Sequence, residues 1–389
     1  MSQKGTNRDV KGRQNESQDV VSLVDGFLAG AVAAGASDVH FEPTEKGLVI
    51  KYRLDGVLNK IDTLPKFLSD NVISRLKVLG NLLTYRNDIP QEGRIEVNSH
   101  NQNVLDERLA IFPTIHGQRA VVRIFYQHKN LTELEQLGFS KDVFETLTKI
   151  AFKNQGVLLL TGPAGSGKST TLAALLRHSL QKFPGKSIVS LEDPVEIRVD
   201  GVTQVQITPY GEMTFPTALR SLLRQDPQVL MIGEIRDAET AKIAIEAALT
   251  GHFLMSTMHC STPAAGFLRL LEMGIEPYQI TSSVAAILNQ RLVRRLCDKC
   301  KKQISNSSYE AAGCESCLNT GYKGRALISE IVELDSGLRK AIAEKADIEK
   351  LQAILKDKGH TNMLTDGKRL VEQGITSADE LNRVCGIIE

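Results

Sequence analysis

The sequence predicts an α/β protein whose main part is a mostly parallel sheet covered by helices, preceded by a smaller α+β domain. Three observations predict this organisation. From residue 156 onward, continuous apolar runs alternate with helical segments, which is typical of parallel strands buried on both faces. Before residue 127, shorter runs alternate apolar and polar residues, as strands with one exposed face do. The length of 389 residues favours two or three domains.

The composition is ordinary for a soluble globular chain. Hydrophobic residues make up 42% and charged residues 24%, and the net charge is +1. No apolar run approaches the roughly 20 residues of a membrane-spanning helix, and the polar start lacks the apolar stretch of a signal peptide. We therefore expect a cytoplasmic chain that reaches a membrane only through partners. The near-neutral charge gives no argument for a nucleic-acid partner, and none is expected.

The N-terminal part is expected to begin with a disordered tail over residues 1–17, which are polar and lack periodicity. An α+β domain is expected over 18–127. Apolar residues at Val24, Phe27 and Leu28 have helical spacing. The runs DVHFEP and GLVIKYRLDGVLNKI indicate strands, with apolar residues on one face and basic residues on the other.

A polar linker is expected over residues 128–140, and the α/β core over 141–292. In the core, strands such as GVLLLTG, SIVSLED, QVLMIGE and HFLMSTMH alternate with helices such as KSTTLAALLRHSL. A module with four cysteines is expected over 293–325, and a helical C-terminal subdomain over 326–389.

The segment GPAGSGKST matches the phosphate-loop pattern GxxxxGK[ST] and lies between an apolar strand and a helix. Its glycines let backbone N–H groups face a phosphate, Lys168 supplies a cation, and Ser169 supplies a hydroxyl for Mg²⁺. The alternative is a glycine-rich turn with an incidental lysine, but the flanking strand and helix favour binding of ATP with Mg²⁺. The expected nucleotide-binding residues are Gly162, Gly165, Ser166, Gly167, Lys168, Ser169 and Thr170.

Two strand ends carry the expected acid chemistry. The stretch QVLMIGEIRD indicates a buried strand that ends in Glu234, with Gly233 where many ATP-hydrolysing folds have an aspartate for magnesium. A second strand, SIVSLED, ends in Glu192. We expect the Glu234 strand beside the phosphate-loop strand, and both carboxylates at the γ-phosphate. We place Glu192 on the attacking water and Glu234 on the magnesium side, and the reverse assignment stays open.

Four motifs follow one another along the chain: the phosphate loop, EDPVE, GEIRD and TGH…STMH. Together with ASDVHFEP, IPQEGRI and RAVVRI upstream, they resemble the secretion and pilus ATPases, the assembly motors of type II secretion and type IV pili (GspE/PilB-like). The resemblance implies a RecA-like P-loop ATPase core and a PAS-like N-terminal domain. It also implies a homohexamer that works on an inner-membrane platform protein, with associated assembly proteins on the cytoplasmic side.

The resemblance implies further residue roles. The family has arginines at the positions of Arg108 and Arg123 that reach the phosphates, and a guanidinium is a planar, permanently charged donor for phosphate oxygens. The alternative is that each is an ion-paired strand residue. His259 matches a γ-phosphate-side histidine, whereas a structural role is as plausible for His252. The family commonly continues LHTNDA where this chain has MHCSTPA, which leaves the surroundings of Cys260 undetermined.

The cysteine module has the spacing C-x2-C-x13-C-x2-C. Two CxxC turns present four thiolates, the ligand set of a structural Zn²⁺ site. The alternative is a pair of reduced thiol turns. The expected zinc ligands are Cys297, Cys300, Cys314 and Cys317.

Two other classes of function are weighed. A nucleic-acid-translocating or DNA-uptake ATPase would also combine an ATPase core with a zinc knuckle, although the chain lacks tryptophan for base stacking. An ATP-sensing scaffold without hydrolysis would explain the missing aspartate, but Lys168, Ser169, Glu192 and Glu234 argue against it. The zinc module favours an assembly motor, since retraction motors typically lack it.

Overall fold

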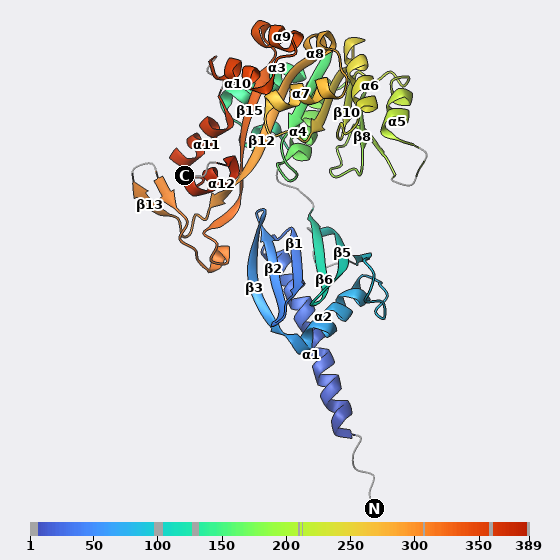
Figure 1. The fold of residues 1–389 in the computed structure, drawn as a ribbon, viewed down its shortest axis with the longest axis vertical. Helices are drawn as coiled ribbons and strands as arrows, with labels where there is room; N and C mark the ends of the chain where they lie inside the picture. The colour runs from blue at the N-terminus through green and yellow to red at the C-terminus, as the bar shows by residue number, and fades with distance from the viewer. Residues whose placement is uncertain are drawn as a thin grey trace, which may run out of the picture. The chain divides into compact units, whose positions relative to one another are not determined.

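The computed structural model describes residues 7–96, 104–126, 132–208, 211, 213–305, 308–357 and 361–386, with side chains from Val20 onward. The chain divides into two compact units, which we call the N-terminal unit (1–128) and the C-terminal unit (129–389) (Figure 1). Within these described ranges, no helix is long and apolar enough to cross a membrane.

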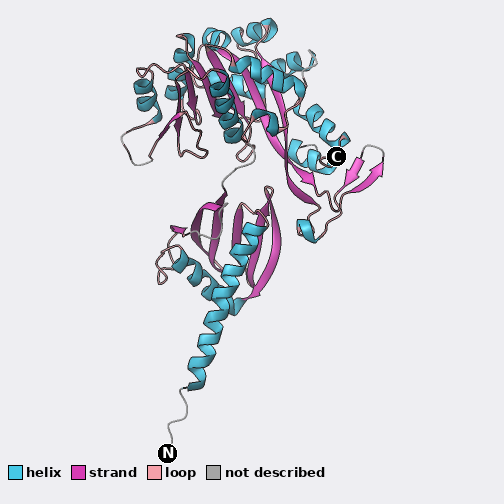
Figure 2. Cartoon of the chain, turned by 180° about the vertical axis from the view of Figure 1, so that it is seen from behind, coloured by secondary structure: helices cyan, strands magenta, loops and turns pink. Residues whose placement is uncertain are grey.

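The N-terminal unit is a six-stranded antiparallel sheet with two helices. The strand order is β3-β2-β1-β6-β5-β4. In chain order the elements are α1 (Asn7–Ala33), β1 (Asp38–Pro43), β2 (Gly47–Leu54), β3 (Val57–Pro65), α2 (Lys66–Leu79), β4 (Gln91–Ile95), β5 (Val104–Thr114) and β6 (Gly117–Tyr126). Figure 2 shows α1 lying along one face of this sheet.

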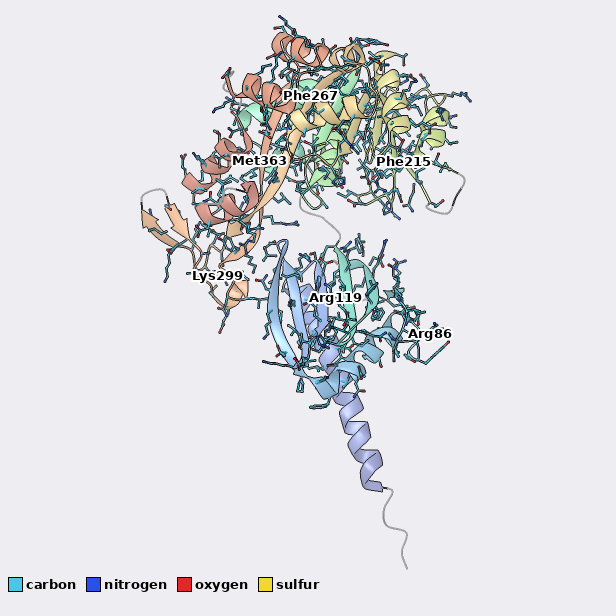
Figure 3. The ribbon with its side chains drawn as sticks, viewed as in Figure 1. Arg86, Arg119, Phe215, Phe267, Lys299 and Met363 are labelled. Atoms are coloured by element: carbon cyan, nitrogen blue, oxygen red, sulfur yellow. The ribbon has the colours of Figure 1, made fainter. Side chains whose placement is uncertain are left out.

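Apolar and polar residues alternate along the strands, so that one face of the sheet is apolar and the other is polar. Val39, Phe41, Ile50 and Val122 are fully buried in the core that the sheet forms with α1 and α2. As predicted, Leu48, Ile50 and Tyr52 share this face. The other face carries charged side chains such as Arg119, whose Nη2 lies 2.9 Å from Nδ1 of His40 (Figure 3).

The structure differs from two expectations about the segments that flank this unit. Residues 7–17 belong to helix α1 instead of a disordered tail, since a helix anchored by Val24 and Leu28 extends with one hydrogen bond per added residue; residues 1–6 lie outside the described residues. Within the expected linker, Leu134 is buried against the C-terminal unit, and Thr132 O accepts a hydrogen bond from Arg177. Residues 128–131 of the expected linker lie outside the described residues.

The C-terminal unit is built on a seven-stranded sheet of order β15-β12-β7-β11-β10-β8-β9, in which all neighbours are parallel except β12 and β15. Its strands are β7 (Gly156–Thr161), β8 (Ile188–Glu192), β9 (Thr203–Gln206), β10 (Val229–Ile232), β11 (Phe253–Met258), β12 (Val284–Leu296) and β15 (Tyr322–Glu333). Its helices up to β12 are α3 (Lys141–Ala151), α4 (Lys168–Lys182), α5 (Phe215–Leu222), α6 (Ala238–Leu249), α7 (Pro263–Glu272) and α8 (Pro277–Ser283).

Helices cover both faces of this sheet, so its central strands are buried throughout. Alternate residues of β7 enter two cores: Val157 packs with α6 and α7 on one face, and Leu158 packs with α3 and α4 on the other. The mostly parallel α/β core is confirmed. The expectation that the Glu234 strand lies beside β7 is wrong, because β11 pairs with both β7 and β10 and so separates them. A helical crossover lets the later strand enter between the two earlier ones.

The last strands correct the predicted start of the helical subdomain at residue 326. Residues 326–333 belong to β15, which pairs antiparallel with β12. The cysteine module is an excursion between these two strands, with β13 (Lys302–Ser305), β14 (Ser308–Glu310) and the short helix η2 (Glu315–Cys317). The helices that follow are α9 (Ser336–Ala343), α10 (Ile348–Asp357), α11 (Met363–Glu372) and α12 (Ala378–Cys385). Strand pairing over a long distance along the chain decides this boundary.

Glu380 of α12 joins the C-terminal helices to β12. Its carboxylate is buried and accepts hydrogen bonds from Arg294 at 2.7 Å and from Arg383 at 2.7 Å. The guanidinium of Arg294 also lies 4.0 Å from the ring centre of Tyr322 on β15. Burial alone would raise the pKa of Glu380, but the hydrogen bonds from Arg383 and Arg294 outweigh it and hold the pKa below its usual value.

Replacing Glu380 by glutamine should lower the free energy of unfolding by about 3 kcal/mol, because Arg294 loses its buried counter-charge. Since the folded-state pKa is lowered, this contribution is complete above the unfolded-state pKa of about 4.3 and is lost as the pH falls through the folded-state pKa. Denaturant unfolding of the wild type and of Glu380→Gln at several pH values measures the difference. Glu372→Gln, at an exposed position of α11, is the control; equal effects of the two changes at neutral pH would contradict the prediction.

Candidate functional site

The phosphate-loop segment connects the end of β7 to the first residue of α4, as predicted. Gly162, Gly165 and Gly167 have φ angles of 140°, 73° and 91°, which disfavour residues with a side chain. A Cβ on Gly162 would also lie 2.4 Å from the carbonyl oxygen of Gln290 on β12. The loop therefore curls tightly against β12 and ends in the N-terminus of α4, where unpaired N–H groups favour an anion.

Lys168 begins α4 and is buried. Its Nζ donates hydrogen bonds to the carbonyl oxygens of Gly162 and Pro163, each at 2.9 Å. Burial lowers the pKa of Lys168, and the nearby carboxylates of Glu234 and Glu196 oppose this effect. The ammonium group thus lies inside the loop, near the carboxylates of Glu234 and Glu196.

Parallel pairing brings the expected acid residues to the edge of the sheet where the loop lies. β11 pairs with β7 so that Met258 is opposite Thr161, and β10 pairs with β8 so that Ile232 is opposite Leu191. The carboxyl ends of parallel strands meet at one edge, which is where ligands bind in open α/β sheets.

Glu192 is the last residue of β8 and is 8% exposed. Its Oε1 accepts hydrogen bonds from Ser190 Oγ at 2.6 Å and from Gln204 Nε2 at 3.0 Å. Burial raises the pKa of Glu192, and the two hydrogen bonds reduce this effect without cancelling it. The carboxylate of Glu192 is therefore fixed by hydrogen bonds and has a raised pKa, two properties that suit a general base.

Gly233 lies directly against Glu192. A Cβ at position 233 would be 3.5 Å from Cα and 3.8 Å from Cγ of Glu192, at ordinary contact distance. An aspartate side chain at this position would extend from that Cβ beside the carboxylate of Glu192. Glycine at position 233 therefore places no charged side chain beside Glu192.

Glu234 has a different environment. Its carboxylate forms an ion pair with Arg236 and lies 3.4 Å from Nε2 of His259. Asp237 caps α6 by accepting a hydrogen bond from the backbone N–H of Thr240 at 2.8 Å. His252 lies at the opposite end of β11, and its Nδ1 is 3.0 Å from the carbonyl oxygen of Ala247. The structure thus brings His259, and not His252, to the Glu234 carboxylate.

Arg108 and Arg123 lie together in the N-terminal unit, opposite each other on β5 and β6. Each donates through Nε to an aspartate: Arg123 to Asp38 at 3.0 Å, and Arg108 to Asp106 at 3.1 Å. Both arginine side chains are more than half exposed. Each guanidinium bonds through Nε and also carries N–H donors on its two terminal nitrogens, which can bind oxyanions.

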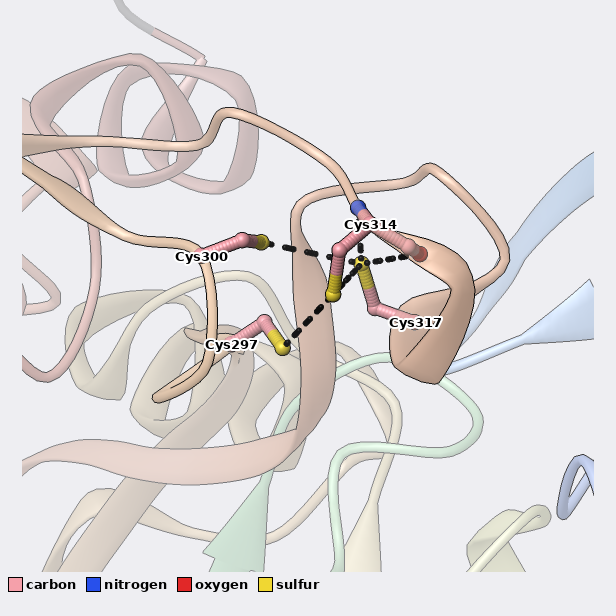
Figure 4. Close-up of side chains that lie close together, drawn as sticks. All are labelled: Cys297, Cys300, Cys314 and Cys317. Atoms are coloured by element: carbon pink, nitrogen blue, oxygen red, sulfur yellow. Dashed lines mark hydrogen bonds between the residues drawn. The ribbon is translucent and has the colours of Figure 1, made fainter.

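The four predicted cysteines form one cluster. Their sulfur atoms lie within 4.8 Å of one another, with Sγ–Sγ distances of 3.9 Å (Cys297–Cys314) and 3.8 Å (Cys300–Cys317 and Cys314–Cys317) (Figure 4). Four sulfurs at about 2.3 Å from a tetrahedral zinc ion are about 3.8 Å apart. Sγ of Cys317 also accepts backbone N–H groups of Cys314 and Gly321. The cluster therefore fits a structural zinc site with four sulfur ligands.

Comparison with known proteins identifies the family. A family model described as "Type II/IV secretion system protein" matches residues 13–383. The chain belongs to this family. The Type II secretion system ATPase E of Vibrio cholerae is 38% identical over 388 residues, which cover 95% of this chain and 76% of the relative. The Type IV pilus assembly ATPase PilB of Thermus thermophilus is 39% identical over 377 residues, 92% of this chain but 42% of the relative, so the chain spans less than half of that protein.

Two solved structures share this fold. The ATPase DotB of Legionella pneumophila superposes with a TM-score of 0.68 at 22% identity, covering 94% of this chain and 95% of that chain. The pilus retraction motor PilT with bound ADP gives a TM-score of 0.59 at 22% identity, covering 94% and 96%. At this identity the likeness concerns the fold. The names of the sequence relatives support an ATP-hydrolysing enzyme.

The sequence patterns did not indicate several residues of the site. Ser190 and Gln204 hold Glu192, and Asp38 and Asp106 hold the two arginines. Gln290 contacts the phosphate loop from β12 and is fully buried. The one available signal was the polar pair NQ inside the apolar run AAILNQRLV, because a buried amide in a strand needs a partner.

Purified protein should contain about one zinc ion per chain, bound by the cysteine cluster. Cys314→Ser should lose the metal, and elemental analysis of the purified variants measures it. Cys385→Ser, which changes a cysteine outside the cluster, is the matched control and should keep the metal. A folded wild-type chain free of metal would contradict the prediction.

Introducing the missing aspartate should impair Glu192. Gly233→Asp places a second carboxylate beside it, which should raise the pKa of Glu192 and move the acidic limb of the ATP-hydrolysis rate to higher pH by about one unit. Gly233→Asn has the same shape without the charge, and Gly233→Ala adds only the Cβ that the site accommodates. The rate of phosphate release as a function of pH measures the shift; equal profiles for the Asp and Asn variants would refute the charge argument.

Proposed function

We propose that the protein is a cytoplasmic, hexameric motor ATPase that hydrolyses Mg-ATP to drive assembly of a type IV pilus or a type II secretion pseudopilus through an inner-membrane platform protein. The observation that carries this proposal is the meeting of a complete phosphate loop with two separate strand-end glutamates at one sheet edge, in a chain of the secretion family. The relatives named as secretion and pilus ATPases support the assignment of the process.

In this proposal, residues 162–170 bind Mg-ATP. Backbone N–H groups of the loop face the phosphates, and Lys168 leaves the carbonyl oxygens of Gly162 and Pro163 to contact the β- and γ-phosphates. Ser169 is the second residue of α4 and is exposed, so its hydroxyl is available to Mg²⁺. The metal would neutralise charge that develops on the phosphate oxygens.

The environments of the two glutamates support different roles. The carboxylate of Glu192 accepts hydrogen bonds from neutral groups and has a raised pKa, which suits it to orient and deprotonate the attacking water. Glu234 is next to Arg236 and His259, so its charge is stabilised and it suits the magnesium side through water. His259 would then sense the γ-phosphate through its contact with Glu234. These contacts favour our first assignment over its reverse.

Arg108 and Arg123 are proposed to contact phosphate oxygens when the two units close. Supporting this are their exposure, their side-by-side position and the aspartates that hold each Nε. Hydrolysis would then depend on closure, as in other enzymes in which a second domain completes the site. Arg220 and Arg224 on or next to α5 are candidates for a neighbouring protomer; Arg220 pairs here with Glu239 at 2.7 Å.

Two further features complete the proposal. The six-stranded antiparallel sheet with its two helices supports a PAS-like N-terminal domain. The cysteine cluster is proposed to bind Zn²⁺ as a structural element, because its four sulfur atoms would supply all four ligands of a tetrahedral zinc ion and leave no position for a substrate. Partners on the cytoplasmic side would include the platform protein and associated assembly proteins, with contact to the membrane through them.

Lys168→Ala should abolish ATP binding, whereas Glu192→Gln should keep binding and lose hydrolysis by at least about a hundredfold. Nucleotide titration and phosphate release measure the two properties separately. Glu246→Gln, at an exposed position of α6, is the matched surface control and should hydrolyse ATP normally. Normal turnover by Lys168→Ala would overturn the proposed function, and normal turnover by Glu192→Gln would overturn only the role of that residue.

A further inference from the structure

Strand β12 continues beyond the end of β7 and runs along the phosphate loop. The last paired residues are Asn289 and Thr161, so Gln290 is level with the first loop residue, Gly162. The backbone of β12 lies so close there that a Cβ on Gly162 would be 2.4 Å from the carbonyl oxygen of Gln290. β12 therefore forms the wall against which the loop folds.

The side chain of Gln290 reaches into the loop from this wall. Gln290 is fully buried, and its Nε2 donates a hydrogen bond to the carbonyl oxygen of Ser166 at 2.9 Å. A Cβ on Gly167 would lie 3.2 Å from the same Nε2. The Oε1 of Gln290 has no hydrogen-bond partner among the residues that the structure describes.

This hydrogen bond decides the orientation of one peptide group. In a trans peptide, the carbonyl of residue 166 and the N–H of residue 167 point in opposite directions. Because Ser166 O is held towards β12, the N–H of Gly167 must point to the opposite side of the peptide plane, away from Gln290. Glycine at 167, with φ of 91°, would tolerate other orientations of this peptide, so the loop sequence alone does not settle it.

Packing does not account for an amide at this position. The neighbours on the same face of β12, Leu288 and Leu292, are apolar, and Leu288 is fully buried. A buried amide oxygen without a partner costs free energy that a leucine of similar volume would avoid. The hydrogen bond from Nε2 to the carbonyl oxygen of Ser166 therefore accounts for an amide at position 290.

We propose that Gln290 is a positioning residue for nucleotide binding: it holds the Ser166 carbonyl against β12 so that the Gly167 N–H is presented to a phosphate of the nucleotide. The inference rests on the proposed function, since it requires the loop to bind ATP. It adds a residue about 120 positions downstream of the loop to the phosphate-binding machinery. Gln290 itself acts through the loop backbone.

Gln290→Leu removes the donor and keeps a similar volume. The contact between the loop N–H groups and the phosphates exists in the ground state and in the transition state alike, so its loss should raise KM for ATP and Kd for ADP about tenfold while kcat changes little. Steady-state ATP hydrolysis and ADP titration measure these constants. A purely structural role would lower the thermal midpoint and the active fraction but would leave KM and Kd unchanged, and that result would overturn the inference.

Ser329→Ala is the matched control. Ser329 is the partner of Gln290 in the β12–β15 pairing, is equally buried, and its hydroxyl also lacks a partner among the described side chains. It should keep wild-type KM and Kd. An equal rise of KM in Ser329→Ala would show a general effect of the strand and would refute the specific role of Gln290.

Gln290→Met provides a second test should the leucine variant fail to fold. A thioether has a similar length and no charge but cannot donate to Ser166 O, so the same rise of KM and Kd is expected, and wild-type values would overturn the inference. The wild type separates the two proposals. A wild-type chain that binds and hydrolyses ATP beside a Gln290→Leu variant with unchanged KM refutes only the role of Gln290, whereas a wild type without ATP binding refutes the proposed function.

Discussion

The parallel pairing of β7, β11, β10 and β8 is the constraint on which the site depends. Because parallel strands place their carboxyl ends at one edge, the phosphate loop after Thr161, Glu234 after Ile232 and Glu192 at the end of β8 are all brought to that edge. The pairing is stable because helices bury both faces of the sheet, which lets all four strands consist almost entirely of apolar residues. The charged residues of the site are therefore found at the strand ends.

The two strand-end glutamates, Glu192 and Glu234, occupy different environments, and glycine at position 233 keeps a further charge away from Glu192. Burial raises the pKa of Glu192 and the carboxylate of Glu196 adds to this effect, whereas glycine at position 233 adds no further negative charge. Glu234 is instead stabilised by Arg236 and His259. One buried carboxylate of high proton affinity and one charge-stabilised carboxylate are a combination suited to separate tasks at a phosphate.

Strand β12 connects features that are far apart in the sequence. Gln290 contacts the phosphate loop, Asn289 donates to the carbonyl of Ser261 after β11, and Arg294 pairs with Glu380 of the C-terminal helices. Cys297, one residue beyond the strand, enters the cysteine cluster. The module and the C-terminal helices are therefore built on the same strand that supports the nucleotide-binding loop, which makes β12 a physical link between them.

The sequence by itself determined the phosphate loop, the glutamates at the ends of β8 and β10, the cysteine cluster and the mostly parallel core, because each depends on local spacing or on apolar runs that pairing must bury. Only the tertiary structure decided the strand order, with β11 between β7 and β10, and the strand character of residues 326–333. It alone also decided which side chains hold Glu192, Arg108, Arg123 and the loop. These features arise from contacts between residues up to more than a hundred positions apart, such as Gln290 with Ser166, and no local pattern specifies which distant groups will meet.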